Sequence, residues 1–300
     1  MTERLVVRHG ELTSAPGLRR RGLLLLAPGA LWLLLFLVLP GVILGAVAFC
    51  ARGADGQVEW TPSLGAFRRL AGYGILGWSP DYLWILVRSV VVAAVTTAGA
   101  LALAYPLAFF VASRAPRWRP VWLGLLSVPL CTNVVVRTYA WELLLSPGLP
   151  PAQLAAWLGW IEPGRALYPS LAAVCLGMIS NALPFAVLPL YTNVERLDRA
   201  LLEAARDLYA SPWRVFRHAV LPQTLPGLTV AAVLTFVPAV GMFVITDRLG
   251  GARHMVIGNL IQQQFGPARN YPFGAAVSLV LIALTLAGLA LQRRRGRGPL

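Results

Sequence analysis

Residues 89–113 read SVVVAAVTTAGALALAYPLAFFVAS, a stretch without an acidic residue or an arginine. It is longer than the ~20 residues that an α-helix needs to cross a bilayer core of ~30 Å. Because backbone polar groups cannot stay unpaired in lipid, a helix is the expected form of such a run. Similar runs, without Asp, Glu or Arg, cover residues 22–51, 120–136, 166–194, 218–246 and 270–292.

The composition agrees with a membrane protein. Of the 300 residues, 57% are hydrophobic and 13% are charged, whereas soluble domains carry about 25% charged residues. These values exclude a disordered chain, a collagen-like chain and a basic, soluble nucleic-acid-binding domain. The sequence therefore predicts an all-α integral membrane protein with six transmembrane helices, at 23–48, 89–111, 121–145, 170–193, 227–247 and 273–291.

The distribution of arginine predicts the topology. The 26 basic residues are all arginine, and the 12 acidic residues leave a net charge of +14. When alternate loops are assigned to opposite sides, 17 arginines fall on one side and eight on the other, with Arg137 inside the third span. The positive-inside rule then places both termini in the cytoplasm. Residues 1–22 and the basic segment 293–300 become cytoplasmic tails around a six-helix domain at 23–292.

The first span could alternatively be a secretory signal, because Ala46-Val47-Ala48 resembles a cleavage site. However, the apolar run before it exceeds the 7–15 residues of a signal core, so we expect an uncleaved helix. Three cysteines in apolar stretches exclude a disulfide scaffold. The histidines His9, His218 and His254 are scattered, so no metal site is predicted.

The polar segment 195–227, on the arginine-rich side, is patterned for two short helices. Leu197, Leu201, Ala204 and Leu208 recur at helical spacing in the first helix. Ser211-Pro212 is a favourable start for the second helix, and Pro222 and Pro226-Gly227 are expected to end it. The segment is either a docking element for a soluble partner or an amphipathic anchor on the lipid headgroups.

Glu203-Ala204-Ala205, followed by Leu208, Ser211 and Phe216, resembles the EAA loop of the inner-membrane permeases of ABC importers. Three other stretches resemble the spermidine/putrescine branch of that family: VRTYAW at 136–141, LPFAVLPLY at 183–191 and GNLIQQQF at 258–265. The resemblance covers residues 20–292. It implies a type I ABC importer permease (MetI-like) fold in a bacterial inner membrane. It also implies coupling to an ATPase through Glu203, Ala204, Ala205, Leu208, Tyr209, Ser211 and Phe216.

The resemblance implies four kinds of partner and no nucleic acid. They are two ATP-binding subunits, a second homologous permease subunit, an extracytoplasmic substrate-binding protein and membrane lipid. A chain without lysine cannot contain the phosphate-binding motif G-x-x-x-x-G-K-[ST]. We therefore expect no cofactor and no catalysis on this chain, with ATP and Mg²⁺ bound by the ATPase subunits.

Tyr209 departs from the pattern of the family, which has glycine four residues after the second alanine of the loop. Glycine adopts a left-handed turn without steric cost, whereas another residue pays about 1–2 kcal/mol. Tyr209 must therefore accept that cost or take another backbone route.

Seven polar or aromatic residues are candidates for the substrate path: Arg137, Tyr139, Trp141, Glu142, Asn181, Tyr191 and Asp247. A polyamine would pair with the carboxylates of Glu142 and Asp247 and with aromatic faces, whereas Arg137 would repel it unless paired. Structural roles are the alternatives: aromatic-belt positions for Tyr139 and Trp141, a solvated loop charge for Asp247, and a structural pair for Arg137 and Glu142.

The leading hypothesis is a permease subunit that forms half of the translocation path of an ATP-driven importer, with a polyamine as substrate. An importer permease for another small solute is one alternative. A stand-alone secondary carrier or channel is another, but it would need intramembrane ionisable residues for coupling, and the sequence offers few. A membrane enzyme would need a catalytic cluster, and none is visible.

Overall fold

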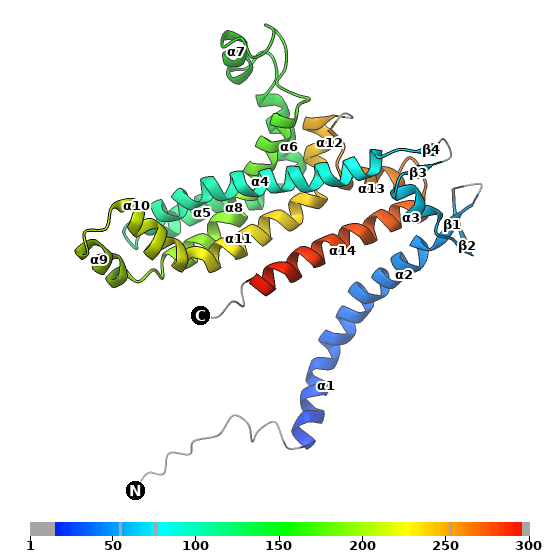
Figure 1. The fold of residues 1–300 in the computed structure, drawn as a ribbon, viewed down its shortest axis with the longest axis horizontal. Helices are drawn as coiled ribbons and strands as arrows, with labels where there is room; N and C mark the ends of the chain where they lie inside the picture. Colours follow the sequence, from blue (N-terminus) through cyan, green and yellow to red (C-terminus); the bar gives the residue numbers. More distant parts are fainter. Residues whose placement is uncertain (1–15, 54–55, 75–76, 252–253, 296–300) are drawn as a thin grey trace.

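The computed structural model describes residues 16–53, 56–74, 77–251 and 254–295. Most of the two predicted tails, 1–22 and 293–300, lies outside these residues. Three long helices form the centre of the bundle and pack against one another: α4 (Asp81–Ala112), α8 (Leu171–Val194) and α11 (Leu221–Gly241). Figure 1 shows them running together, with the helices of the 195–227 segment at one end and the small strands at the other.

Small side chains let these helices approach closely. Ala93, Ala100, Ala104 and Ala108 of α4 are completely buried, as expected for helix packing in membranes. At the crossing of α8 and α11, a Cβ atom added to Gly227 would lie 2.5 Å from the Cβ of Asn193. Only glycine therefore fits at this crossing.

The prediction of spans is largely confirmed. Among the described residues, five helices are long and apolar enough to cross a membrane, and a bent pair makes a sixth candidate. The first span combines α1 (Pro16–Leu33), a π-helical turn at Leu34–Val38 and α2 (Leu39–Ala48). Within this first span, α2 packs against the last helix, α14 (Tyr271–Arg295), whereas α1 diverges from the bundle (Figure 1).

The prediction of one continuous third helix at 121–145 is wrong. The structure has α5 (Arg119–Cys131) and α6 (Val134–Leu144), which meet at 93°. Pro129 removes a backbone donor from the last turn of α5, and Thr132 is extended. Asn133 then caps the new helix, because its side-chain oxygen accepts from the Val135 amide at 2.8 Å.

The predicted end of the second loop helix at Pro222 and Pro226 is also wrong. The helix runs without a break from Pro212 to Gly241, through α10 (Pro212–Val215), a π-helical turn at Phe216–Val220 and α11. The π-helical turn lies immediately before Pro222, and the Thr224 hydroxyl donates to the Val220 carbonyl at 3.1 Å within the same helix. One helix therefore connects the 195–227 segment to the interior of the bundle.

The fifth span ends earlier than predicted, at Gly241 instead of residue 247. Met242 is extended, and a separate helix, α12 (Val244–Gly250), follows. A further short helix, α13 (Ile257–Phe265), packs against α12. Another short helix, α7 (Pro150–Trp157), follows α6 in the sequence. α7 lies at the far end of α6, away from the bundle (Figure 1).

Two antiparallel strand pairs lie at the end of the bundle opposite the 195–227 segment. β1 (Cys50–Arg52) pairs with β2 (Val58–Pro62), and β3 (Tyr73–Gly74) pairs with β4 (Gly77–Trp78). The helix α3 (Gly65–Leu70) lies between them in the sequence. The membrane part is all-α as predicted, and these small sheets are an addition outside it.

Candidate functional site

The 195–227 segment forms the two-helix surface element that its pattern predicts. Its first helix, α9 (Arg199–Asp207), begins after Asp198, whose side chain accepts from the Ala200 amide at 2.9 Å. The Asp198 amide donates to the side-chain oxygen of Gln223 at 3.2 Å, which ties α9 to the long fifth helix. Glu203 and Ala204 are exposed, and Ala205 is half-buried.

The turn after α9 carries an apolar surface. Leu208 is 82% exposed, Tyr209 is 97% exposed and Trp213 is 67% exposed. Exposed apolar side chains of this size, five to ten residues after the exposed Glu203 of α9, are the kind of surface that a protein partner covers.

Tyr209 takes the strained route. Its φ is +53°, in the left-handed region, and the Ala210 amide closes the turn by donating to the Ala205 carbonyl at 3.3 Å. Ser211 is extended and precedes the second helix as predicted, although its side chain makes no capping hydrogen bond. The turn thus has the left-handed backbone that glycine adopts without steric cost, with tyrosine at this position.

Phe216 points toward the bundle. Its ring meets Tyr105 edge-on at 5.9 Å and stacks with Trp213 at 5.6 Å. Tyr105 in turn shares a 2.8 Å hydrogen bond with Thr224. Of the residues expected to couple this chain to a partner, Phe216 is therefore the one that anchors the element to α4.

An ion pair fixes the same end of the bundle. Arg119 donates to Glu195 at 2.7 Å and to the Ala112 carbonyl at 3.0 Å. It therefore joins the start of α5 to the C-terminal ends of α4 and α8. No motif in the sequence indicated this contact, because Arg119 and Glu195 are 76 residues apart.

Replacing Tyr209 tests whether the left-handed turn or the aromatic ring matters. Tyr209→Gly removes the backbone strain of about 1–2 kcal/mol, so we expect a thermal midpoint at or above that of the wild type. Tyr209→Ala removes the ring but retains the strained φ, so its midpoint should lie below that of Tyr209→Gly. Equal midpoints for the two variants in detergent would contradict strain at this residue.

The expected substrate-path residues of α6 lie where α6 packs against α8 and α12. Trp141 donates its indole N–H to Ser180 of α8 at 2.8 Å. The Tyr139 hydroxyl accepts from Arg248 of α12 at 2.5 Å. Asp247, also on α12, is exposed. The structure therefore brings the α6 candidates and Asp247 into one region, where α6 packs against α12: the α6–α12 region.

Arg137 and Glu142 do not form the suggested structural pair. No ion pair joins them among the described residues. Nε and Nη1 of Arg137 and Oε2 of Glu142 are instead buried without a hydrogen-bond partner in the described part of the chain. Unpaired buried charged groups are costly and often functional.

Two expected residues lie elsewhere. Tyr191 is buried beside Glu195 and Arg119, at the end of α8 that carries the 195–227 segment, so it is far along α8 from Ser180. Asn181 lines a small cavity between α8 and α11, together with Met178, Phe185 and Pro238. Neither residue belongs to the α6–α12 region.

A cluster around Asn259, which sequence reasoning did not assign, holds the break between α11 and α12. The Asn259 side chain donates to the Phe243 carbonyl at 3.1 Å and accepts from the Thr246 hydroxyl at 2.6 Å. The Ile257 amide donates to Ser89 of α4 at 2.7 Å. The stretch GNLIQQQF at 258–265 contains the residues that make this cluster, because its Gly258-Asn259 pair contacts the break between α11 and α12.

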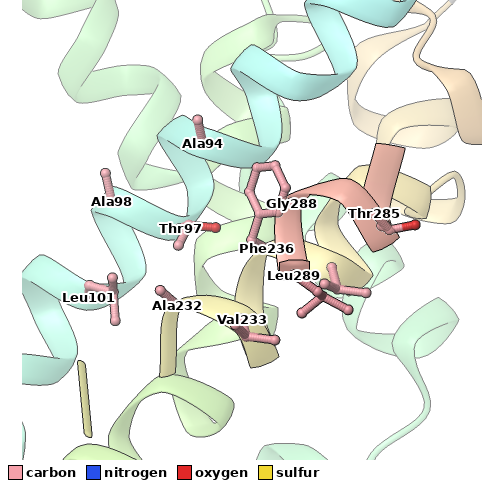
Figure 2. A pocket seen from close by; sticks show the side chains of 11 residues that line it. Ala94, Thr97, Ala98, Leu101, Ala232, Val233, Phe236, Thr285, Gly288 and Leu289 are labelled. Carbon is pink, nitrogen blue, oxygen red and sulfur yellow. The ribbon is translucent and has the colours of Figure 1, made fainter. Parts of the chain in front are cut away.

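An apolar groove lies between α4, α11 and α14 and has a volume of about 500 Å³. Figure 2 shows its lining, in which Phe236, Leu101 and Leu289 are the largest labelled apolar side chains and Thr97 and Thr285 are the polar ones. None of the expected substrate-path residues lines it, and its lining contains no charged side chain. A charged solute therefore has no partner in this groove.

Comparison with known proteins gives the family. Residues 104–297 match the model of the binding-protein-dependent transport system inner membrane component. The chain belongs to this family of ABC importer permeases. As such it is a multi-pass inner-membrane transport subunit and not an enzyme.

Curated relatives of this permease match most of its length. It is 37% identical over 250 residues to the spermidine/putrescine transport system permease protein PotB of Escherichia coli (strain K12), covering 83% of this chain and 88% of PotB. It is 34% identical over 254 residues to PotB of Haemophilus influenzae, covering 84% and 86%.

The fold of the permease also has solved counterparts. A chain of a bacterial alginate ABC transporter, crystallised in complex with an alginate pentasaccharide-bound periplasmic protein, superposes with a TM-score of 0.67. The match covers 94% of this permease and 96% of that chain at 14% identity. The predicted type I ABC importer permease fold is therefore confirmed.

Proposed function

We propose that the chain is a permease subunit of an ATP-driven importer of polyamines such as spermidine and putrescine. The observation that carries this proposal is the 37% identity to PotB over 83% of the chain. The aromatic and carboxylate side chains of the α6–α12 region supply groups that bind ammonium. The polyamine class of substrate thus agrees with both the relatives and the local chemistry.

The proposed assembly contains a second homologous permease subunit, two ATP-binding subunits and a substrate-binding protein on the outer side. ATP and Mg²⁺ bind to the ATP-binding subunits, and this chain holds no cofactor. Both termini and the 195–227 segment face the cytoplasm, as the arginine distribution predicts. Lipid surrounds the exposed apolar helices.

In the proposed coupling, the ATPase covers the exposed face of α9 and the apolar turn at Leu208 and Tyr209. Glu203, Ala204, Ala205 and Ser211 shape this face, and Phe216 holds it against the bundle. Movement of the ATPase passes into the membrane along the continuous helix Pro212–Gly241. That helix ends at the break beside α12, so the motion reaches the α6–α12 region.

The test is uptake by the complete transporter. The chain is co-expressed with its ATPase, second permease and binding protein, and reconstituted in liposomes with ATP inside. We expect ATP-dependent uptake of labelled spermidine that unlabelled putrescine reduces and sulfate does not. Uptake by this chain without the ATPase would contradict ATP coupling, and equal competition by sulfate would contradict the polyamine assignment.

Import of an anionic solute is the second candidate. The partly buried guanidinium of Arg137, with two buried nitrogen atoms that have no hydrogen-bond partner among the described residues, is a group that binds carboxylate or phosphate. The same assay, with labelled anions in place of spermidine, distinguishes the two.

A further inference from the structure

Two broken spans meet in this permease. α6 follows the break at Thr132–Asn133, and α12 follows the break at Met242–Phe243. The two helices pack against one another and stand beside each other in Figure 1. Irregular backbone at membrane depth occurs where it is covered by protein or lines a water-filled cavity, and broken helices commonly build the substrate sites of transporters.

A cation already occupies an aromatic face at this meeting point. The guanidinium carbon of Arg248 lies 4.6 Å from the centre of the Tyr139 ring, and Nη2 donates to the Tyr139 hydroxyl at 2.5 Å. Tyr139 is 47% exposed and Arg248 is exposed. No carboxylate lies within 4.0 Å of Arg248 in the described part of the chain. The tyrosine, and not an ion pair, therefore holds this arginine.

The backbone beneath Arg248 is fixed. Asn259 bridges Phe243 and Thr246, and Leu249, next to Arg248, is completely buried. The Arg248 side chain can therefore leave the Tyr139 ring by rotation about its own bonds, without movement of α12.

Carboxylates near the ring favour a positively charged ligand. Glu142 lies three residues after Tyr139 on α6, a spacing that places the two on neighbouring positions of the helix surface. Its Oε2 atom has no hydrogen-bond partner among the described residues. Asp247 is exposed beside Arg248. An aromatic face with nearby carboxylates is the chemistry that binds alkylammonium groups.

We propose that the Tyr139 face is an alkylammonium-binding site of the transport path, and that Arg248 is a tethered cation that occupies it in the absence of substrate. The inference rests on the proposed polyamine import. A substrate ammonium displaces the guanidinium from the ring, and Arg248 returns when the substrate leaves. Arg248 thereby lowers the affinity of the permease for its cation and keeps the site from holding it too tightly.

The experiment measures retention of labelled spermidine by the assembled transporter in nanodiscs, without the binding protein, whose own affinity would mask the site. We expect Arg248→Gln to bind spermidine about 2- to 30-fold more tightly, the range that corresponds to a cation–π contact of about 0.5–2 kcal/mol. Tyr139→Leu should weaken binding by a similar factor. Arg248→Lys, which keeps the charge, should stay close to the wild type.

A second variant protects the test against misfolding of Arg248→Gln. Tyr139→Phe keeps the ring and removes the hydroxyl that accepts from Arg248, so it should bind spermidine at least as tightly as the wild type. The matched control is Arg69→Gln. Arg69 also stacks on aromatic rings, 4.9 Å from the centre of Phe273 and 5.8 Å from that of Tyr82, but outside the α6–α12 region, and its loss should leave retention unchanged.

Two results overturn the proposal. If Arg248→Gln binds spermidine as the wild type does or more weakly, Arg248 does not compete with the substrate and only holds α12 against α6. If Tyr139→Phe weakens binding as much as Tyr139→Leu, the ring is not the site. Uptake of spermidine by the wild type in liposomes distinguishes failure of this inference from failure of the proposed function. If the wild type takes up spermidine but Arg248→Gln does not bind it more tightly, only this inference is contradicted. If the wild type takes up no spermidine, the proposed function and the inference are both contradicted.

Discussion

Glu203→Arg is expected to abolish ATP-driven uptake while the permease remains folded in the membrane. Glu203 is exposed on α9, beside the apolar surface at Leu208 and Tyr209, so its reversal costs the isolated chain little. In the proposed complex the ATPase covers this face. Loss of one member of a covered charge pair costs about 2–5 kcal/mol, which is more than tenfold in binding, and reversal of its charge adds repulsion.

The measurement is the amount of ATPase subunit that co-purifies with the permease, followed by ATP hydrolysis and uptake in liposomes. The control is Glu59→Arg, which reverses an exposed carboxylate on β2, at the opposite end of the bundle, and should leave ATPase retention unchanged. Normal retention and coupled hydrolysis with Glu203→Arg would exclude α9 as the docking helix.

Hydropathy predicted where the spans lie but not where they break. The runs around 89–113 and 166–194 form α4 and α8, because a single apolar segment in a bilayer satisfies its backbone hydrogen bonds by forming a helix. The run at 120–136 also became helix, but Asn133 ends it by capping a second helix at 93°. A capping side chain and a packing partner decide such a break, and a hydropathy pattern contains neither.

The start of each helix in the 195–227 segment was predictable because its pattern is local. The spacing of Leu201 and Ala204 predicted the first helix, and Ser211-Pro212 predicted where the second helix begins but not where it ends. The sequence did not predict whether Tyr209 adopts the left-handed turn or another backbone route. A cost of about 1–2 kcal/mol for the left-handed turn is small enough for packing of the neighbouring helices to outweigh it. The continuous helix through Pro222 likewise depends on a π-helical turn that no sequence rule located.

For the α6–α12 region, the sequence predicted the candidate residues of α6 and Asp247 but not Arg248. Glu142 was a candidate because charged residues inside spans are unusual, and Tyr139 and Trp141 were candidates because aromatic faces bind ammonium groups. Arg248 was missed, since it follows Asp247 in what the sequence presents as a loop. Its contact with Tyr139 spans 109 residues, and only the packing of two broken helices brings the two together. Tyr191, whose ring chemistry suits a polyamine, lies apart from this region, beside Glu195 and Arg119 at the other end of α8.

Gly258→Ala is expected to lower the thermal stability of the permease and to reduce uptake. A Cβ atom at residue 258 would lie 2.4 Å from the Gly241 carbonyl oxygen and 3.2 Å from the Cβ of Phe243. The closest atom belongs to the backbone, so α13 must move away from the break between α11 and α12. Overpacking of this kind typically costs about 1–3 kcal/mol.

The control is Gly124→Ala, on α5, where an added Cβ meets no atom within 4 Å. Alanine in a helix interior is better than glycine by about 0.5–1 kcal/mol, so this variant should be as stable as the wild type or more so. The comparison is made on thermal midpoints in detergent. An unchanged midpoint for Gly258→Ala would show that α13 does not press on the break.

Asn259→Ala separates the steric effect of Gly258 from the hydrogen bonds beside it. It leaves the close approach to Gly241 intact and removes the contacts to the Phe243 carbonyl and the Thr246 hydroxyl. If the break is held mainly by these bonds, Asn259→Ala should lower the thermal midpoint as much as Gly258→Ala does. If close packing dominates, its midpoint should stay near the wild type, because the Thr246 hydroxyl can donate to the Phe243 carbonyl, 2.9 Å away, once Asn259 is removed.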